Sequence, residues 1–376
     1  MVLALRRAAP DEVLCCICSN AQAVRGSPGL DMIPINPGAQ RAANGRVPAV
    51  ARKIVNKSIM WLHAYRHLAS LKAIVVPGTG ILDDFRIGPL GWPYDLFCWF
   101  SLARLMGVKV FLVSVGAGPI RCRTSRFLLK SAARAAHYRS YRDEASKSFM
   151  RRIGLDTSAD PVFPDLAFSL PTTPSAVSDR YPLTVGVGVM AYHGWLKNAE
   201  YSGSVYDGYI AKMTDYIRWL RAQGHCVRIL IGDDSDDHAA QDILRRLGAK
   251  NADRPDGMVS YTPAYTLDQI MEQMEDVDVA VATRFHNVIC ALKMGKPTIS
   301  IGYAPKNDAL LAEMGLADFC QHIDQLDVEL LKTQTSRLIS VRAELEPIIR
   351  ATCARYKTRL VEQEDRIASM ICDHSP

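Results

Sequence analysis

The sequence lacks any long hydrophobic run. Its longest apolar stretch, residues 110–120, contains two glycines and a proline. A helix that spans a bilayer needs about 20 predominantly apolar residues, so a membrane span is excluded. The first twelve residues have no apolar core of the length found in signal peptides. We therefore expect a cytoplasmic protein.

The sequence also lacks a strong excess of charge of either sign. Its 45 basic and 39 acidic residues give a formal net charge of +6 over 376 residues. This mild balance does not call for nucleic acid as a partner, but it is compatible with an anionic small substrate or with peripheral contact with an acidic membrane surface. Hydrophobic residues make up 48% and charged residues 22%. These are values of an ordinary globular protein, which excludes a disordered or fibrous chain.

Metal-binding patterns are missing as well. The chain has ten cysteines, but no CxxC pair is followed by a second one downstream, as a structural zinc site would require. We interpret Cys15, Cys16 and Cys18, which lie in one apolar run, as small buried hydrophobes in a reduced protein. The acidic stretch 233–237 lacks the glycine and distal glutamate of a calcium loop, so helix capping is the favoured interpretation. We expect no bound metal.

What the sequence does contain is a regular alternation of strands and helices. Short, almost wholly apolar runs are typical of parallel strands covered on both faces, and they occur at Val13–Ser19, Ala73–Pro77, Lys109–Val115, Leu183–Val189, Cys226–Ile231, Val277–Thr283 and Thr298–Ile301. Between them, Tyr209–Leu220 has helical spacing and ends at Gly224. A second helical stripe comprises Phe127, Leu128, Ala132, Ala135 and Ala136. The fold class is therefore α/β.

A break in this alternation divides the chain. Residues 173–182 are rich in proline, serine and threonine and have no period, so we predict a linker there. It separates an N-terminal α/β domain, residues 1–172, from a C-terminal α/β domain, residues 183–326. Residues 327–376 are predicted to be helical, with one break at Pro347. Two such domains suggest a ligand crevice at the carboxyl ends of their strands.

Two glycine turns follow predicted strands of the N-terminal domain. The first holds Gly78, Thr79 and Gly80 and leads to Asp84; the second holds Gly116 and Gly118. Glycine lets a ligand approach the backbone closely, and free N–H groups in such turns can hold an anion. Ordinary strand-end turns, with Asp83 or Asp84 capping a helix, explain the same pattern. Neither turn has the GxGxxG or P-loop spacing of a nucleotide-binding loop.

The strongest signal lies in the C-terminal domain. Arg284 and His286 directly follow a predicted strand and precede a predicted helix, a place where free N–H groups and the helix dipole favour anions. The Arg guanidinium matches a carboxylate or phosphate, and His can deliver a proton near neutral pH. Lys306 follows the next strand and would share this rim if the two strands are parallel. A surface arginine, a capping histidine and a solvated lysine are the structural alternatives.

Together these motifs resemble the polysaccharide pyruvyl transferase family. The resemblance covers about residues 70–315 and rests on VVPGTGILDDF (75–85), SVGAGPI (114–120), SYRDEAS (140–146), PDLAFSL (164–170) and VAVATRFHNVICALKMGKPTISIGYAPK (279–306). It implies two Rossmann-like domains arranged as in glycosyltransferase-B enzymes. It also implies transfer of pyruvate from phosphoenolpyruvate to a hydroxyl pair of a glycan or glycolipid precursor, without a cofactor. By resemblance, Arg284 binds phosphoenolpyruvate and His286 is catalytic. We assign Lys306 to the phosphate.

Two features depart from the family pattern. Met190 stands where family members often have a second arginine. The opening residues resemble the end of a first helix followed by a second strand, so the first strand and its Gly-Asp loop are expected to be missing. Loss of that strand would remove part of the crevice and could abolish activity. Two other functions therefore stay open: a nucleotide-sugar glycosyltransferase, with Arg284 and His286 on a diphosphate, and a non-catalytic descendant that binds a sugar or a partner enzyme.

Overall fold

The computed structural model of the chain describes residues 1–8, 10–18, 30–37, 49–84, 87–172, 181–194, 199–248, 258–303 and 305–372. These residues form two units. Unit 1 comprises Met1–Leu166 and Thr358–Pro376, and unit 2 comprises Ala167–Lys357. Most of the predicted linker, residues 173–180, lies outside the described residues. None of the described helices combines the length and the apolar character that crossing a membrane requires.

Unit 1 is built on parallel strands. Its strands are β1 (Cys15–Cys18), β2 (Asp31–Pro34), β3 (Ala73–Pro77), β4 (Lys109–Val115) and β5 (Tyr138–Tyr141). They form two separate sheets, one of order β1-β2 and one of order β3-β4-β5. Its helices are α1 (Val2–Ala8), α2 (Ala49–Leu68), α3 (Trp92–Leu105), α4 (Arg123–Ala135) and α5 (Glu144–Arg152).

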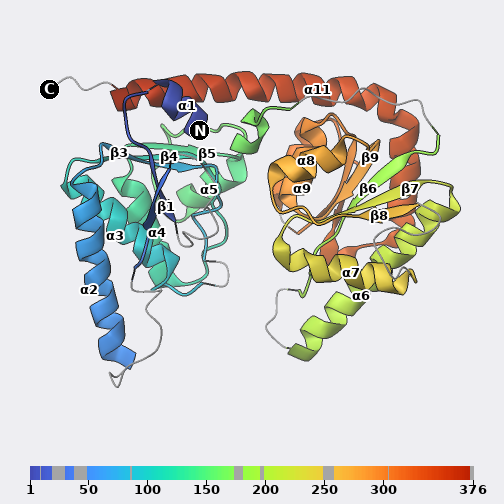
Figure 1. The fold of residues 1–376 in the computed structure, drawn as a ribbon, viewed down its shortest axis with the longest axis horizontal. Helices are drawn as coiled ribbons and strands as arrows, with labels where there is room; N and C mark the ends of the chain where they lie inside the picture. Colours follow the sequence, from blue (N-terminus) through green and yellow to red (C-terminus); the bar gives the residue numbers. More distant parts are fainter. Residues whose placement is uncertain are drawn as a thin grey trace. The chain divides into compact units, whose positions relative to one another are not determined.

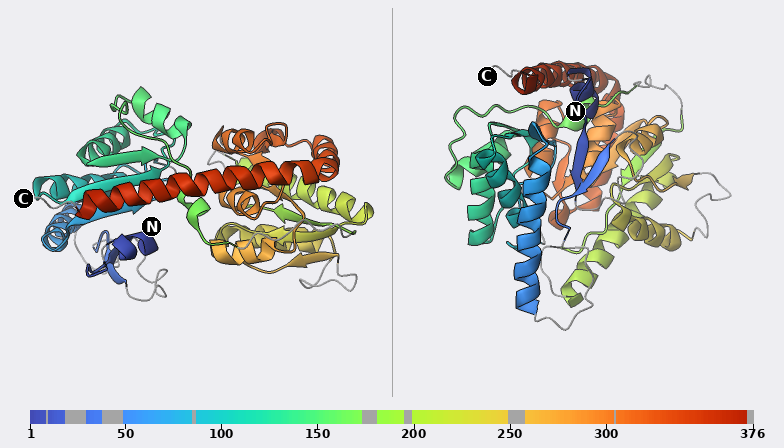
Figure 2. Two further views of the ribbon diagram at one scale, coloured as in Figure 1. Left: turned by 90° about the horizontal axis from the view of Figure 1, so that it is seen from above. Right: turned by 60° about the vertical axis from the view of Figure 1, so that its left-hand side comes forward.

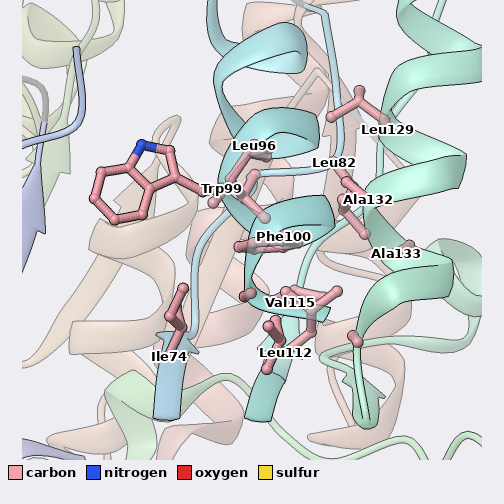
Figure 3. Close-up of a cluster of buried hydrophobic side chains, with 14 of the residues drawn as sticks. Ile74, Leu82, Leu96, Trp99, Phe100, Leu112, Val115, Leu129, Ala132 and Ala133 are labelled. Carbon is pink, nitrogen blue, oxygen red and sulfur yellow. The ribbon is translucent and has the colours of Figure 1, made fainter. Parts of the chain in front are cut away.

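The main core of unit 1 lies between the sheet and helices α2, α3 and α4. Ile74 of β3 and Leu112 of β4 meet Trp99 and Phe100 of α3 there, and Leu129 of α4 closes the cluster (Figure 3). All five side chains are at most 8% exposed. Burial of large apolar side chains is the main source of stability here, since each contributes about 1.5–3 kcal/mol.

The other face of the β3-β4-β5 sheet is covered by the last part of α11 (Val328–Cys372). Phe111 of β4 and Ile367 of α11 belong to one buried cluster. A buried polar group joins the same elements. Gln363 Nε2 donates to Ser140 Oγ at 2.6 Å, and Ser114 Oγ donates to Gln363 Oε1 at 2.9 Å. Residues 358–372 of α11 are thus an integral part of unit 1.

Unit 2 contains one parallel sheet of order β11-β10-β9-β6-β7-β8. Its strands are β6 (Thr184–Gly188), β7 (Cys226–Leu230), β8 (Val259–Tyr261), β9 (Val279–Ala282), β10 (Thr298–Gly302) and β11 (Cys320–His322). Its helices, besides the first part of α11, are α6 (Ala199–Ala222), α7 (Asp237–Arg246), α8 (Leu267–Met274), α9 (Phe285–Lys293) and α10 (Pro305–Glu313), and two 3₁₀ turns, η2 (Asp234–Asp236) and η3 (Ile323–Gln325), precede α7 and α11. Figure 1 shows the helices packed around this sheet.

The predicted α/β class is confirmed, and each of the seven predicted strands is present within one or two residues. Three expectations were wrong. Phe127 is 61% exposed and does not join the buried stripe of α4. Cys15, Cys16 and Cys18 are half-buried rather than buried, because β1 is an edge strand. The predicted break at Pro347 is absent, since α11 continues through it, although the helix bends once along its length (Figure 1).

Candidate functional site

Arg284 occupies the N-cap position of α9, directly after β9 and Thr283. Its guanidinium is held by Asp236 of η2. Arg284 Nε donates to Asp236 Oδ2 at 2.8 Å, and Nη2 donates to Oδ1 at 2.6 Å. The Asp236 side chain has no exposed surface, whereas that of Arg284 is 23% exposed. The two residues therefore form a bidentate ion pair that is mostly buried and whose guanidinium is partly exposed.

Asp236 also connects a third strand end to this pair. Its Oδ1 accepts a hydrogen bond of 2.9 Å from the backbone N–H of Ala191, which follows β6. Gly232, which follows β7, makes the packing possible. A Cβ at Gly232 would lie 2.9 Å from Arg284 Cβ, closer than real side-chain contacts allow. The ends of β6, β7 and β9 thus converge on one carboxylate and one guanidinium.

Nearby carboxylates balance the positive charge of Arg284. Burial would lower the pKa of Arg284, but the hydrogen bonds and charge of Asp236 outweigh that effect and raise it. Asp233 is ionised nearby, because hydrogen bonds from Ser235 lower the pKa of its carboxyl group. Arg284 Nη1 has no hydrogen-bond partner among the residues that the structure describes. Asp236 thus engages Nε and Nη2 of the guanidinium and leaves Nη1 unused.

His286 and Lys306 lie beside Arg284 in the same unit. β9 and β10 are parallel neighbours, with Ala282 opposite Ser300, so their carboxyl ends share one edge of the sheet. His286 is the second residue of α9 and is exposed. Lys306, in the first turn of α10, places Nζ 4.5 Å from the centre of the Phe285 ring. The structure therefore brings together the three predicted residues of the C-terminal domain.

Met190, which stands where family members often have a second arginine, is buried after the end of β6. Its side chain is only 8% exposed, and its backbone N–H donates to Tyr209 Oη at 3.4 Å. Met190 contributes no charge at the end of β6. Any second cation for an anionic ligand must come from another position.

The two glycine turns of unit 1 also meet. Gly116 N donates to Thr79 O at 2.8 Å, and Gly118 N donates to Leu82 O at 3.1 Å. Gly78 has a φ of +44°, which glycine adopts without strain. Thr79 and Gly80 are exposed, whereas Gly116 is buried. The turns after β3 and β4 therefore form one backbone surface at the carboxyl edge of their sheet.

Asp84 has a structural partner. Its two carboxylate oxygens accept 2.9 Å hydrogen bonds from the backbone N–H groups of Arg121 and Cys122, at the start of α4. Both N–H groups precede Arg123, the first residue of α4, so Asp84 holds the loop before the helix and does not cap its first turn. A role of Asp84 in substrate binding stays a prediction.

Arg142, which sequence reasoning did not single out, lies against the glycine turns. A Cβ at Gly116 would lie 2.6 Å from its Nη2, so any larger residue there would displace the guanidinium. Arg142 Nη1 donates to Asp165 Oδ2 at 3.1 Å, and both side chains are almost fully buried. This ion pair joins the SYRDEAS and PDLAFSL motifs. The motifs themselves were the available signal, but their mutual contact was not visible in the sequence.

A metal centre has no candidate in the described part of the chain, where no three His, Cys, Asp or Glu side chains gather closely enough to hold an ion. The acidic residues after β7 have other partners. Asp233 accepts from Ser235 N, Asp236 pairs with Arg284, and Asp237 accepts from Tyr261 Oη. The ten cysteines are all free thiols.

The fold defines the class of the protein. Solved structures with the same arrangement include a glycosyltransferase from Rickettsia africae (TM-score 0.59, 9% identity, 99% of this chain and 95% of that one). They also include UDP-GlcNAc 2-epimerase from Methanocaldococcus jannaschii (0.56, 10%, 89% and 88%) and the lipopolysaccharide outer core galactosyltransferase WaaB (0.50, 13%, 91% and 84%). At these identities the likeness concerns the fold alone. The chain has a glycosyltransferase-B-like α/β fold.

The sequence identifies the family within that class. The family model of polysaccharide pyruvyl transferases matches residues 35–305. No curated protein sequence matches the chain. The chain belongs to the polysaccharide pyruvyl transferase family, so the predicted resemblance is confirmed. Membership implies transfer of pyruvyl groups on polysaccharides.

Proposed function

We propose that the protein transfers pyruvate from phosphoenolpyruvate to two hydroxyls of a glycan or glycolipid precursor, forming a cyclic ketal. The observation that carries this proposal is the position of Arg284, His286 and Lys306 at one sheet edge, where the first two residues lie inside the region that matches the family and Lys306 directly follows it. A guanidinium, an imidazole and an ammonium are suited to a donor that carries both a carboxylate and a phosphate.

Asp236 determines which anionic group of phosphoenolpyruvate each of these side chains would bind. It offsets the charge of Arg284 and fixes the orientation of the guanidinium, so Arg284 would bind through Nη1, as a directed donor to the carboxylate. Lys306 and the backbone N–H groups in the first turn of α9 would then bind the phosphate. The N-cap side chain of α9 makes no capping hydrogen bond to these N–H groups. Phosphate at a helix N-terminus is favoured by the dipole.

His286 would supply the proton that the reaction needs. The first sugar hydroxyl adds to C2 of phosphoenolpyruvate while C3 accepts a proton from the imidazolium, which turns the methylene into a methyl group. The second hydroxyl then attacks C2, inorganic phosphate leaves with the C–O electron pair, and the ring closes. His286 can regain a proton from an attacking hydroxyl. An exposed side chain next to the helix N-terminus can approach such a donor without rearrangement of the core.

The test is an incubation of the purified protein with phosphoenolpyruvate and cell glycolipid or polysaccharide extracts. We expect phosphate release, together with an acceptor whose mass rises by pyruvate minus water. His286→Ala is the negative control, and His322→Ala, an exposed histidine of the same unit, is the matched positive control. A lipid-linked product would support the proposed peripheral membrane contact.

The same assay separates the competing functions. Release of a nucleotide from a nucleotide-sugar, with phosphoenolpyruvate left intact, would identify a glycosyltransferase instead. Sugar binding without turnover of either donor would identify a non-catalytic descendant, in line with the uncharged Met190 at the end of β6. Either result would reject pyruvyl transfer by this chain.

A further inference from the structure

The positive charge of the chain is concentrated in one segment of unit 1. Residues 121–154 contain ten lysines and arginines and two acidic residues, so this segment has a net charge of +8. The whole chain of 376 residues has a net charge of +6, which means that the 342 residues outside the segment together carry −2. A local excess of this kind favours an anionic partner, because clustered charges of one sign create a field that attracts the opposite charge.

Most of these cations lie at the surface without a counter-charge. Arg139 and Arg142 are the exceptions, since they pair inside unit 1 with Asp160 at 2.8 Å and with Asp165 at 3.1 Å. None of the other eight forms an ion pair with a carboxylate in the part of the chain that the structure describes. Six of the eight are exposed, namely Arg121, Arg123, Arg126, Arg134, Arg151 and Arg152.

Helix α4 arranges four of the eight cations in one stripe. Arg123, Arg126, Lys130 and Arg134 follow one another at intervals of three or four residues, which places them on one side of the helix. Phe127 lies within this stripe and is 61% exposed. We call these five residues the cationic face of α4.

The cationic face lies on the outer side of unit 1. The opposite side of α4 is in the core, where Figure 3 shows Leu129, Ala132 and Ala133 directed toward α3. Helices α2, α3 and α4 form a layer on one face of the β3-β4-β5 sheet, and the end of α11 covers the other face (Figure 2). The cations of α4 therefore point away from the sheet and from its core.

Exposed apolar side chains accompany the cations on this layer. Leu62 and Tyr65 of α2 are 51% and 54% exposed, and Leu105, the last residue of α3, is 81% exposed. One exposed apolar side chain needs no explanation, but several on one layer of helices, together with cations, are typical of a surface that contacts a lipid bilayer. Anionic headgroups attract the cations, and apolar side chains enter the region between headgroups and acyl chains.

The same apolar side chains argue against a nucleic acid as the partner. Cations and polar groups bind the phosphates of a duplex, and an exposed Phe127 would gain nothing there. Unpaired bases stack on aromatic rings, but stacking does not use Leu62 or Leu105. An anionic bilayer is the partner that uses both the cations and the apolar side chains.

Helix α4 also begins next to the glycine turns of unit 1. It follows the turn after β4, and the loop before it is tied to the turn after β3, because the backbone N–H groups of Arg121 and Cys122 donate to Asp84 at 2.9 Å. The helix that follows a parallel strand starts at the carboxyl edge of the sheet. A bilayer in contact with the first turns of α4 would therefore lie near the edge that carries both glycine turns.

We propose that the cationic face of α4 is a docking surface for an anionic lipid bilayer. Its four cations bind the phosphates of acidic lipids, and Phe127 enters the interfacial region. The helix does not insert as an isolated amphipathic helix would, because its apolar side is in the core of unit 1. Docking is therefore reversible and weakens as the salt concentration rises. The inference concerns membrane docking and does not depend on the donor.

The experiment measures co-sedimentation of the full chain with vesicles of phosphatidylcholine, either alone or with about 30% phosphatidylglycerol. We expect binding to the anionic vesicles and not to the neutral ones. A triple variant of α4, Arg126→Gln with Lys130→Gln and Arg134→Gln, should lower the partition coefficient on anionic vesicles by about tenfold or more.

A matched control removes the same amount of charge elsewhere. Arg218→Gln, Arg245→Gln and Arg355→Gln together remove three exposed cations of unit 2, and this variant should bind the vesicles like the parent protein. Circular dichroism checks that both triple variants are folded. Equal binding of the two variants would overturn the proposal, because binding would then depend on net charge alone.

Phe127 provides a second test that leaves the charge unchanged. Phe127→Ala should weaken binding to anionic vesicles by about threefold or more, whereas Phe127→Trp should retain it, because Trp favours the membrane interface. Equal binding of these two variants would remove Phe127 from the docking surface and overturn its role there. Binding of duplex DNA at a salt concentration at which neither kind of vesicle is bound would also overturn the proposal and assign the cationic face to a nucleic acid.

Discussion

Arg284 and Asp236 form a bidentate ion pair in which the carboxylate is fully buried and one guanidinium nitrogen, Nη1, has no hydrogen-bond partner among the described residues. The two residues are 48 positions apart in the sequence. The pair fixes the direction of Nη1 and, at the same time, offsets the positive charge of Arg284. Under the proposed function, a donor anion at this edge would gain an oriented hydrogen bond from Nη1, while Lys306 would supply most of the net positive charge.

The first prediction concerns Asp236→Asn. The variant leaves a partly buried guanidinium without its counter-charge, so we expect a loss of about 2–3 kcal/mol in the free energy of unfolding. We also expect weaker binding of phosphoenolpyruvate, because Arg284 loses its fixed orientation. Denaturant titration and donor-binding calorimetry measure the two effects. Asp215→Asn, at an exposed ion pair with Arg218, is the control and should cost less than about 1 kcal/mol.

The second prediction concerns Arg284→Lys. A single ammonium cannot reproduce three directed N–H donors, so we expect affinity for phosphoenolpyruvate to fall by about tenfold or more. Arg245→Lys changes an exposed arginine that pairs with Asp242 and should leave affinity unchanged. If Arg284→Lys binds the donor as tightly as the parent protein, Arg284 does not hold the carboxylate.

The third prediction concerns His286→Ala. Since His286 is exposed and lies in the first turn of α9, its truncation should leave the melting temperature within a degree or two while turnover is lost. Circular dichroism checks the fold, and phosphate release checks turnover. Full turnover in this variant would remove His286 from the mechanism.

The fourth prediction concerns the contact between Gly116 and Arg142. Gly116→Ala places a methyl group 2.6 Å from Arg142 Nη2, so the guanidinium must shift from Asp165. We expect a loss of about 1–3 kcal/mol in stability. Gly80→Ala is the matched control, because its methyl group would lie 3.7 Å from the same nitrogen, an ordinary contact. Equal stability of both variants would show that the Gly116 turn adjusts at no cost.

The fifth prediction concerns pH. Burial lowers the pKa of His225, which is 9% exposed, although the charge of Asp278 partly opposes the effect. The unfolded chain therefore takes up this proton first as the pH falls, so stability decreases below about pH 6.5 and levels off below the folded-state pKa. His225→Gln should flatten this part of the pH profile of the unfolding free energy. An unchanged slope would assign the dependence to other groups.

The sequence predicts some elements far better than others, for a physical reason. β3 and β4 were predicted to the residue because apolar side chains fill them almost completely. β5 was missed because its sequence, YRSY, is half polar, and Arg139 is compensated by Asp160 at 2.8 Å, a contact that only the fold creates. β8 and β11 were missed because each has only three residues.

The residues of the candidate site also differ in how well the sequence predicts them. Arg284, His286 and Lys306 could be found because a strand end next to a helix start is a local pattern. Asp236 could not, since it belongs to an acidic stretch whose other members cap helices or accept from tyrosine. Its role follows from the neighbouring positions of β6, β7 and β9, which the sequence does not encode locally.

The division of α11 between the two units has a consequence for synthesis. Unit 1 is assembled from two segments, Met1–Leu166 and Thr358–Pro376, and Gln363 of the second segment bonds to Ser114 and Ser140 in the interior of the unit. During synthesis, residues 358–372 emerge after all of unit 2, so the face of the β3-β4-β5 sheet that they cover stays exposed until then. Unit 1 can therefore complete its core only after the chain of unit 2 has been made.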